Sequence, residues 1–386
     1  MASKLTANYI PEILSLGLSR SKPRLVGVNL TDRCNQRCIY CEIGTSPLST
    51  GKNAIQIDDM TWIIDQMAEH RIKRLALFGG EPFLFEGIVD IIRYAGKKNI
   101  RSSVTTNGMT AHKLTGEEIK ILKEYKTEIN VSIDSFHDEV QAFTRGTDNA
   151  LPNALKSIQL LKEYAIPITA LTVISKYNYL DLSESFAKAF EKGIRQVLYQ
   201  PVIFNSNYPG RQPVPDKAKL NVDPEDTDVL MDQLNRILKF EQKHKIRSNV
   251  YRLLPWIGHY LKTAASPNGD WFFYKVLDKF ICREIYAIIE IGYDGGIQPC
   301  ALLPANFSVI HDKDHNLVEL WSKATERVRE DVGKGMYPEC CNACCNHFSR
   351  NMLASIFKHP VRNRSALIRM LPLAISRVQW RILRSL

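Results

Sequence analysis

The sequence lacks long apolar segments. No stretch approaches the roughly 18 to 20 uninterrupted apolar residues that a membrane-spanning helix requires. The first twenty residues also lack a basic start followed by a clean apolar core, which is the pattern of a secretion signal. With 386 residues, of which 45% are apolar, the chain can still bury a large core. We therefore expect a globular, cytoplasmic protein that is not exported.

Acidic residues are absent after Glu339, although the chain as a whole carries a net charge of +10. The basic residues of this tail are Arg350, Lys358, Arg362, Arg364, Arg369, Arg377, Arg381 and Arg384. The first 339 residues therefore carry only about +2, too little for the basic groove of a polynucleotide-binding protein. We expect no nucleic-acid partner.

Cysteine is absent between residues 41 and 282, and the nine cysteines fall into two groups. The first group is Cys34, Cys38 and Cys41, and the second is Cys282, Cys300, Cys340, Cys341, Cys344 and Cys345. In a chain that is not exported, thiols stay reduced, so cysteines serve as metal ligands or reactive groups more often than as disulfides. The distribution predicts two separate metal centres.

Residues 26 to 200 alternate between short β-branched, apolar runs and amphipathic stretches of helical period. This pattern predicts repeated βα units around a parallel sheet. The expected strands are Val26 to Leu30, Arg74 to Gly79, Arg101 to Thr106, Glu128 to Ile133, Pro167 to Ile174 and Gln196 to Gln200. A proline- and glycine-containing loop at residues 205–217 then ends the repeating unit.

Two further elements are expected beyond that loop. Asp223 is a candidate helix cap with Pro224 at the first helical position, ahead of an apolar stripe of helical period. Short strand-like runs flank Asp294, Gly295 and Gly296, a combination that indicates a hairpin.

The first three cysteines follow a strand with the spacing C-x3-C-x2-C, and Tyr40 precedes the last of them. Thiolates at this spacing on one loop can hold a compact iron-sulfur cube and leave one iron without a protein ligand. A structural zinc site is the alternative, but three cysteines are one ligand short of its closed set.

This segment resembles the signature of the radical S-adenosylmethionine (SAM) superfamily. The resemblance implies that Cys34, Cys38 and Cys41 ligate a [4Fe-4S] cluster, whose fourth iron is chelated by the methionyl amine and carboxylate of SAM. Reductive cleavage of SAM would yield a 5′-deoxyadenosyl radical, with the electron supplied by a partner such as flavodoxin or ferredoxin. Tyr40 would lie against the adenine.

Two later motifs match the same family at the ends of expected strands, where βα barrels carry their active-site loops. Gly79-Gly80-Glu81-Pro82 resembles the family's "GGEP" motif, in which the glycines allow close backbone approach and the region of Gly80 and Glu81 holds the methionyl amine. Asn107, at the end of the third strand, resembles an element near the cofactor; a simple strand-terminating turn is the alternative.

Ser132 and Asp134 alternate along the fourth strand, so they share a face that can hydrogen-bond ribose hydroxyls. The pair matches the family's S-x-D segment. Arg145, followed by Gly146, resembles the usual continuation and is a candidate partner for the methionyl carboxylate. A solvated arginine at a helix end is the alternative. No catalytic residue beyond this cofactor set is identified.

The second group of cysteines resembles the C-terminal extension called SPASM or, in its shortened form, twitch. Cys282, Cys300, Cys341 and Cys344 would then hold one auxiliary [4Fe-4S] cluster. Cys340, Cys345 and His347 are alternative ligands. A four-cysteine zinc site also remains open, because C-x2-C pairs suit zinc equally well.

The basic tail has apolar residues at helical spacing with arginines on the other side. It is either a helix lying in the plane of an anionic membrane or docking on an acidic partner, or a terminal helix packed on the core. A membrane-lying tail hints at a lipid-like substrate.

The expected fold class is α/β: a partial (β/α)6 TIM-like barrel followed by a Cys-rich twitch/SPASM-like domain. The expected divisions are an N-terminal extension at 1–25, a radical SAM core at 26–212, a helical connector at 213–280, the auxiliary cluster domain at 281–348 and the tail at 349–386. The expected enzyme abstracts a hydrogen atom from an unidentified peptide, small-molecule or lipid-like substrate. A non-catalytic iron-sulfur or zinc module, acting as electron carrier or sensor, is the alternative.

Overall fold

The computed structural model describes residues 22–45, 54–203, 213–264, 282, 284–338, 340, 341 and 344. Cys345, His347 and the basic tail at 349–386 lie outside the described residues, as does most of the N-terminal extension. None of the helices in these ranges combines the length and the apolarity needed to cross a membrane.

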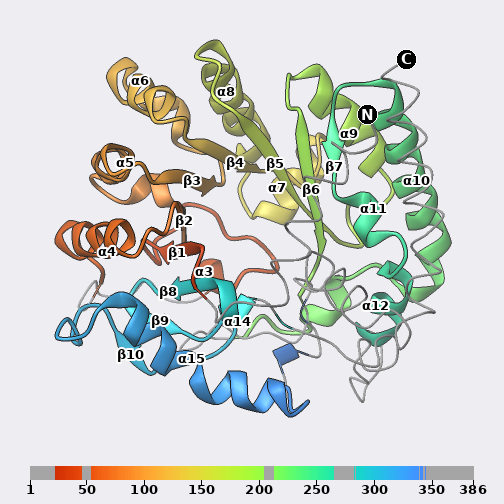
Figure 1. The fold of residues 1–386 in the computed structure, drawn as a ribbon. Helices are drawn as coiled ribbons and strands as arrows, with labels where there is room; N and C mark the ends of the chain where they lie inside the picture. The colour runs from red at the N-terminus through yellow and green to blue at the C-terminus, as the bar shows by residue number, and fades with distance from the viewer. Residues whose placement is uncertain are drawn as a thin grey trace, which may run out of the picture.

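A curved sheet of ten strands organises the fold, in the order β10-β9-β8-β1-β2-β3-β4-β5-β6-β7 (Figure 1). The strands are β1 (Leu25–Asn29), β2 (Arg74–Phe78), β3 (Arg101–Thr106), β4 (Glu128–Ser132), β5 (Ile168–Ile174), β6 (Gln196–Pro201), β7 (Arg247–Ser248), β8 (Ile288–Ile291), β9 (Gly296–Gln298) and β10 (Phe307–Ser308). Strands β1 to β6 pair in parallel in sequence order. The six strands expected from the sequence are confirmed to within one residue at each end.

Helices cover the outer side of the curved sheet (Figure 1). The α-helices are α3 (Glu42–Thr45), α4 (Ile57–Glu69), α5 (Ile88–Lys97), α6 (Gly116–Glu124), α7 (Asp138–Arg145), α8 (Ala150–Glu163), α9 (Leu182–Glu191), α10 (Thr227–Lys243), α11 (Val250–Leu253), α12 (Ile257–Ala264), α14 (Glu284–Ala287) and α15 (Leu317–Gly333). Short 3-10 turns lie at η1 (Pro82–Leu84), η2 (Ala111–Lys113), η3 (Lys217–Leu220) and η4 (Pro224–Asp226). Local sequence explains several starts; α6, for example, begins at a capping box in which Thr115 and Glu118 exchange hydrogen bonds.

The two faces of the sheet differ in burial. On β1, Val26 and Val28 are fully buried and belong to the core beneath the helices. Gly27 and Asn29 alternate with them and therefore lie on the inner face of the curved sheet. The inner-face residues of β2 to β5 are only partly buried, in contrast to those that face the helices.

The sheet extends beyond the six expected strands at both ends. The expected hairpin is confirmed: β8 and β9 pair in an antiparallel manner, and β8 also pairs in parallel with β1. The C-terminal part of the chain thus continues the barrel sheet. At the other end, β7 adds in parallel to β6, within the expected helical connector. A strand of two residues is too short to leave a recognisable pattern in the sequence.

The expected helix start at Pro224 differs in detail. Residues Pro224–Asp226 form the 3-10 turn η4, the side chain of Asp223 makes no capping hydrogen bond, and α10 begins only at Thr227. Proline at the first position suits either type of helix because both leave its missing N–H without a partner.

Candidate functional site

The loop that carries Cys34, Cys38 and Cys41 continues directly from β1 and is held by the turn after β2. The Gly80 N–H donates to the Thr31 carbonyl at 2.7 Å, and the Glu81 N–H donates to the Arg33 carbonyl at 2.8 Å. Gly79 has a φ of +136°, and a Cβ there would lie 2.5 Å from the Thr31 oxygen. The glycines allow another backbone segment to approach closely, and that segment is the cysteine loop.

The end of α7 holds the other half of the same loop. The Arg37 and Ile39 N–H groups donate to the carbonyls of Arg145 and Thr144, at 3.0 and 3.1 Å. Gly146 ends the helix in the left-handed region at a φ of +60°, and a Cβ there would overlap the Arg37 carbonyl. Elements far apart in the sequence therefore fix the cysteine loop from two sides.

Cys38 is buried, Cys34 and Cys41 are half-buried, and N–H donors lie near two of the three sulfurs. The Asn107 amide is 3.7 Å from the Cys34 sulfur, and the Arg145 guanidinium is 3.9 Å from the Cys38 sulfur. Burial raises the pKa of Cys34, with the charges of Glu81 and Cys41 adding to the shift, and burial raises that of Cys38 to about 12 against the opposing effect of Arg145. Such thiols lose their protons only when a cation compensates the thiolate charge.

Glu81 joins the turn after β2 to the end of β3. Its carboxylate accepts from the Thr106 hydroxyl and the Asn107 N–H, each at 2.7 Å, and from the Phe83 N–H at 3.1 Å. The side chain is fully buried, and burial raises its pKa to about 7 against the opposing effect of these hydrogen bonds. Of about four acceptor positions on a carboxylate, three are used within the protein.

A hydrogen-bonded cluster next to the cysteine loop contains Tyr40, Asp134 and Arg145. The Tyr40 hydroxyl donates to Asp134 at 2.5 Å, and Arg145 pairs with the same carboxylate at 2.7 Å. Asp134 also accepts from the Val173 N–H at 2.9 Å. The Arg145 side chain is buried, the charge of Asp134 raises its pKa against desolvation, and its Nε has no hydrogen-bond partner among the described residues.

The structure thus brings most of the expected cofactor residues to one end of the barrel strands. Ser132 is the last residue of β4 and lies on the inner face, partly buried. Asp134 lies beyond the strand end and is turned toward Tyr40 and Arg145. The expected direct contacts of Asp134 and Arg145 with the cofactor remain predictions, because each already has a partner in the protein.

The later cysteines also approach one another. Cys300 and Cys340 are hydrogen-bonded through their side chains, and Cys340 makes the same kind of bond with Cys341. The bond to Cys340 and burial raise the pKa of Cys300 well above its usual value, and burial raises that of Cys282 to about 12. Cys340, one of the alternative ligands, therefore lies close to Cys300, although the two are far apart in the sequence.

The first cysteine group fits an iron-sulfur cluster. Among the described residues, no three Cys, His, Asp or Glu side chains converge at the spacing of ligands to one metal ion. A cubane accepts a wider arrangement, because each thiolate binds a different iron, and hydrogen bonds to the sulfurs are part of such sites. Three thiols on one fixed loop, two with N–H donors nearby, fit this donor set.

A buried ion pair that the sequence does not reveal lies beside the first cysteine group. Lys217, in η3, contacts Glu42, the residue after Cys41, at 2.5 Å, and both side chains are at least nine-tenths buried. The partners are distant in sequence, so no local pattern pairs them. The contact ties the segment after β6 to the cysteine loop.

Replacing Lys217 with methionine is expected to lower the free energy of unfolding by about 3 kcal/mol or more, because it leaves the Glu42 charge buried without this cation. Lys219→Met, in the same turn, is the matched control: its pair with Asp216 is exposed and should contribute little. Urea unfolding of the three proteins measures the difference. Equal losses in both variants would contradict the expectation.

Glu290 is a second unanticipated charge, in the middle of the apolar run of β8. Glu290 as a whole is only partly buried. Its Oε2 atom, however, is enclosed and has no hydrogen-bond partner among the described residues. Burial, followed by the like charge of Glu284, raises its pKa to about 8. A charged residue inside an otherwise apolar strand is the signal that could have identified it.

A raised carboxyl pKa means that the folded state binds this proton more tightly than the unfolded state does. Its contribution to stability is complete below about pH 4 and is lost as the pH rises to about 8, by up to about 1.4 kcal/mol per pH unit. We expect Glu290→Gln to flatten the fall in the thermal unfolding midpoint between pH 5 and pH 8.5. Parallel pH profiles for the variant and the wild type would show that the group titrates normally.

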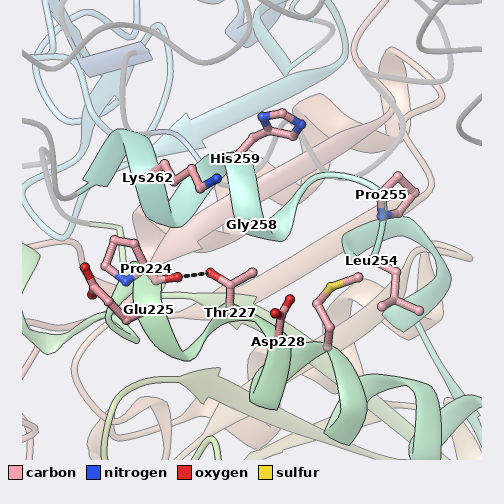
Figure 2. A pocket seen from close by; sticks show the side chains of 10 residues that line it. Pro224, Glu225, Thr227, Asp228, Leu254, Pro255, Gly258, His259 and Lys262 are labelled. Carbon is pink, nitrogen blue, oxygen red and sulfur yellow. Dashed lines mark hydrogen bonds between the residues drawn. The ribbon is translucent and has the colours of Figure 1, made fainter.

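A surface hollow of about 370 Å³ lies away from these residues, between α12 and the start of α10 (Figure 2). Figure 2 shows Lys262 and His259 of α12 on one side and Thr227 and Asp228 of α10 on the other. The lining includes no cysteine and no residue of the family motifs. It is therefore not the candidate site.

Comparisons with known proteins agree with the geometry. The model of the radical SAM superfamily matches residues 28–189. The antilisterial bacteriocin subtilosin biosynthesis protein AlbA of Bacillus subtilis is 26% identical over 82% of this chain and 65% of its own length. A GTP 3′,8-cyclase of Listeria welshimeri is 35% identical over 46% of this chain and 54% of its own length. The chain thus spans about half to two thirds of these relatives.

Two solved structures share the fold over most of the chain. Streptococcus suis SuiB bound to S-adenosylmethionine superposes with a TM-score of 0.60 at 16% identity, covering 89% of this chain and 76% of SuiB. The enzyme anSMEcpe with bound AdoMet and a Cp18Cys peptide gives 0.59 at 15% identity, covering 92% of this chain and 98% of its own. Residues 28–189 therefore carry a domain of the radical SAM superfamily, and the two solved structures share the fold over most of the chain.

Proposed function

We propose that this protein is an enzyme that uses SAM and a [4Fe-4S] cluster at Cys34, Cys38 and Cys41 to abstract a hydrogen atom from a peptide substrate. One observation carries the proposal: the three cysteines lie on a single loop that the Gly79-Gly80 turn and the end of α7 fix from two sides. A fixed loop of three thiolates matches a cluster with one open iron.

When bound, the cluster and SAM together supply reductive cleavage to a 5′-deoxyadenosyl radical. The residues of the chain hold and orient them. Asn107 and Arg145 donate toward the cysteine sulfurs and so stabilise their thiolate form. Tyr40 is held by Asp134, with Arg145 5.7 Å from its ring centre, so its ring presents a fixed surface for the adenine.

The remaining polar positions suit the other parts of SAM. Glu81 retains about one acceptor position for the methionyl amine, and the Arg145 Nε is a donor without a partner in the described chain. Ser132, on the inner face, is placed for a ribose hydroxyl. Because Asp134 already binds Tyr40 and Arg145, we propose that it positions these two side chains in addition to any contact with the ribose.

A peptide is the favoured substrate class among those that the sequence leaves open. AlbA is named for bacteriocin biosynthesis, and solved structures of SuiB and anSMEcpe contain peptides. We further propose the domain divisions given above, an auxiliary [4Fe-4S] cluster at Cys282, Cys300, Cys341 and Cys344, a cytoplasmic location and a flavodoxin- or ferredoxin-type reductant. The role of the basic tail, on a membrane or on an acidic partner, remains a prediction.

Anaerobic reconstitution with iron and sulfide tests the proposal, followed by metal counting and reaction with dithionite and SAM. About eight irons per chain together with 5′-deoxyadenosine support two clusters and the enzyme. About four irons and one zinc, with the nucleoside still formed, would assign the second site to zinc. A loaded protein that leaves SAM intact under strong reductant would overturn the enzyme in favour of an electron carrier or sensor.

A further inference from the structure

We propose that the interior of the barrel holds a binding site for an organic cation, the ammonium or guanidinium group of a substrate side chain, formed by Glu290 and Phe78 above Gly27. This inference rests on the function proposed above in one respect: the bound molecule is taken to be the substrate.

Strand pairing places the three residues together. Gly27 lies opposite Glu290 in the parallel pairing of β1 with β8, and Phe78 ends the neighbouring strand on the other side of β1. All three alternate with residues of the buried outer face, such as Val26 and Val28, so they share the inner face.

The absence of a side chain at Gly27 lets the Glu290 carboxylate and the Phe78 ring lie against the backbone of β1. A Cβ at this position would lie 2.7 Å from the Glu290 Oε2 and 3.0 Å from two carbons of the Phe78 ring. The carboxylate and the ring therefore approach each other over the bare backbone of β1. No side chain larger than hydrogen fits there without displacing one of them.

The Glu290 carboxyl group has no cationic partner among the described residues, and a bound cation would favour its ionised form. Its Oε2 is enclosed without a hydrogen bond, and no Lys or Arg of the described residues forms an ion pair with it. An enclosed carboxylate without a partner is unfavourable. A carboxylate next to an aromatic ring is a combination that binds organic cations, through ion pairing and through the negative face of the ring.

The position suits a substrate. Strand β1 leads directly into the loop of Cys34, and the hairpin that starts with β8 leads to Cys300, whose pKa is affected by the charge of Glu290. The strands that carry the proposed cation site therefore connect to both candidate cluster sites. A side chain bound there is held on the inner face of the sheet.

A pair of peptide mimics tests the proposal on the reconstituted full chain. Nα-acetyl-lysine methylamide carries the cation, and Nα-acetyl-norleucine methylamide is its neutral counterpart. By isothermal titration, the wild type should bind the lysine probe at least about tenfold more tightly than the norleucine probe. Glu290→Gln should remove this difference, and Phe78→Leu should reduce it. Glu191→Gln, an exposed carboxylate on α9, is the control and should preserve it.

Equal binding of the two probes to the wild type, no binding of the lysine probe, or a preference that survives Glu290→Gln would each overturn the cation site. Circular dichroism of each variant checks that it is folded. Formation of 5′-deoxyadenosine without substrate is measured on the same samples. If the protein forms the nucleoside but fails the probe test, only the cation site is rejected. If it passes the probe test but forms no nucleoside, the proposed radical chemistry is rejected.

Discussion

Cys38→Ala is expected to reduce 5′-deoxyadenosine formation to background, at least about a thousandfold below the wild type, because the cofactor supplies the reaction and the variant cannot hold it. Cys38 is the most enclosed thiol of its loop, and the Arg145 guanidinium lies 3.9 Å from its sulfur. Two thiolates cannot replace three at a cubane, so the iron content should fall by about four per chain. Iron analysis and product quantification by chromatography measure both effects.

The reciprocal variant separates the two metal sites. Cys282→Ala should also lose about four irons if the second site holds a cluster, yet retain SAM cleavage in the absence of substrate within about threefold, because distant sites contribute independently. Loss of the nucleoside product in both variants would mean that the two cysteine groups do not act as separate sites. Full activity of Cys38→Ala would reject the assignment of the first cluster.

Much of this fold could be predicted from the sequence because its signals are local. Each barrel strand is a short β-branched run followed by a helix with apolar residues at helical spacing, and parallel βα repeats leave few alternative topologies. The hairpin was visible for a similar reason, since Asp294 and two glycines mark its turn. Strand β7 was missed because two residues carry no periodicity.

The candidate site could be predicted only as far as its motifs reach. The cysteine spacing and the glycine turn are local patterns, but the partners of Asp134 are not. Its bonds to Tyr40 and to the Val173 backbone join residues that are tens of positions apart. The alternation of Ser132 and Asp134 along the strand therefore predicted a contact with the ribose. In the folded structure, the Asp134 carboxylate is instead turned toward Tyr40 and Arg145. The pairing of Lys217 with Glu42 was hidden for the same reason.

Gly80 and Gly146 both contact the backbone of the cysteine loop. A methyl group at Gly80 would overlap the Arg33 carbonyl, and one at Gly146 would overlap the Arg37 carbonyl. Neither obstacle is a flexible side-chain end, so the backbone of the loop must move. Because Cys34 and Cys38 directly follow these two carbonyl positions, Gly80→Ala should displace the first thiol and Gly146→Ala the second.

We expect each alanine variant to lower the rate of 5′-deoxyadenosine formation by about a hundredfold or more, since a shift of about 1 Å in a positioned group has effects of this size. Gly333→Ala is the matched control: nothing lies within 4 Å of its added methyl group, and alanine suits the end of α15. The rate should be measured per bound cluster, with iron content determined on the same samples. If both loop variants retained wild-type rates and iron content, the loop would be mobile enough to absorb the methyl groups, and its rigidity could not be what prepares the three thiols for a cluster.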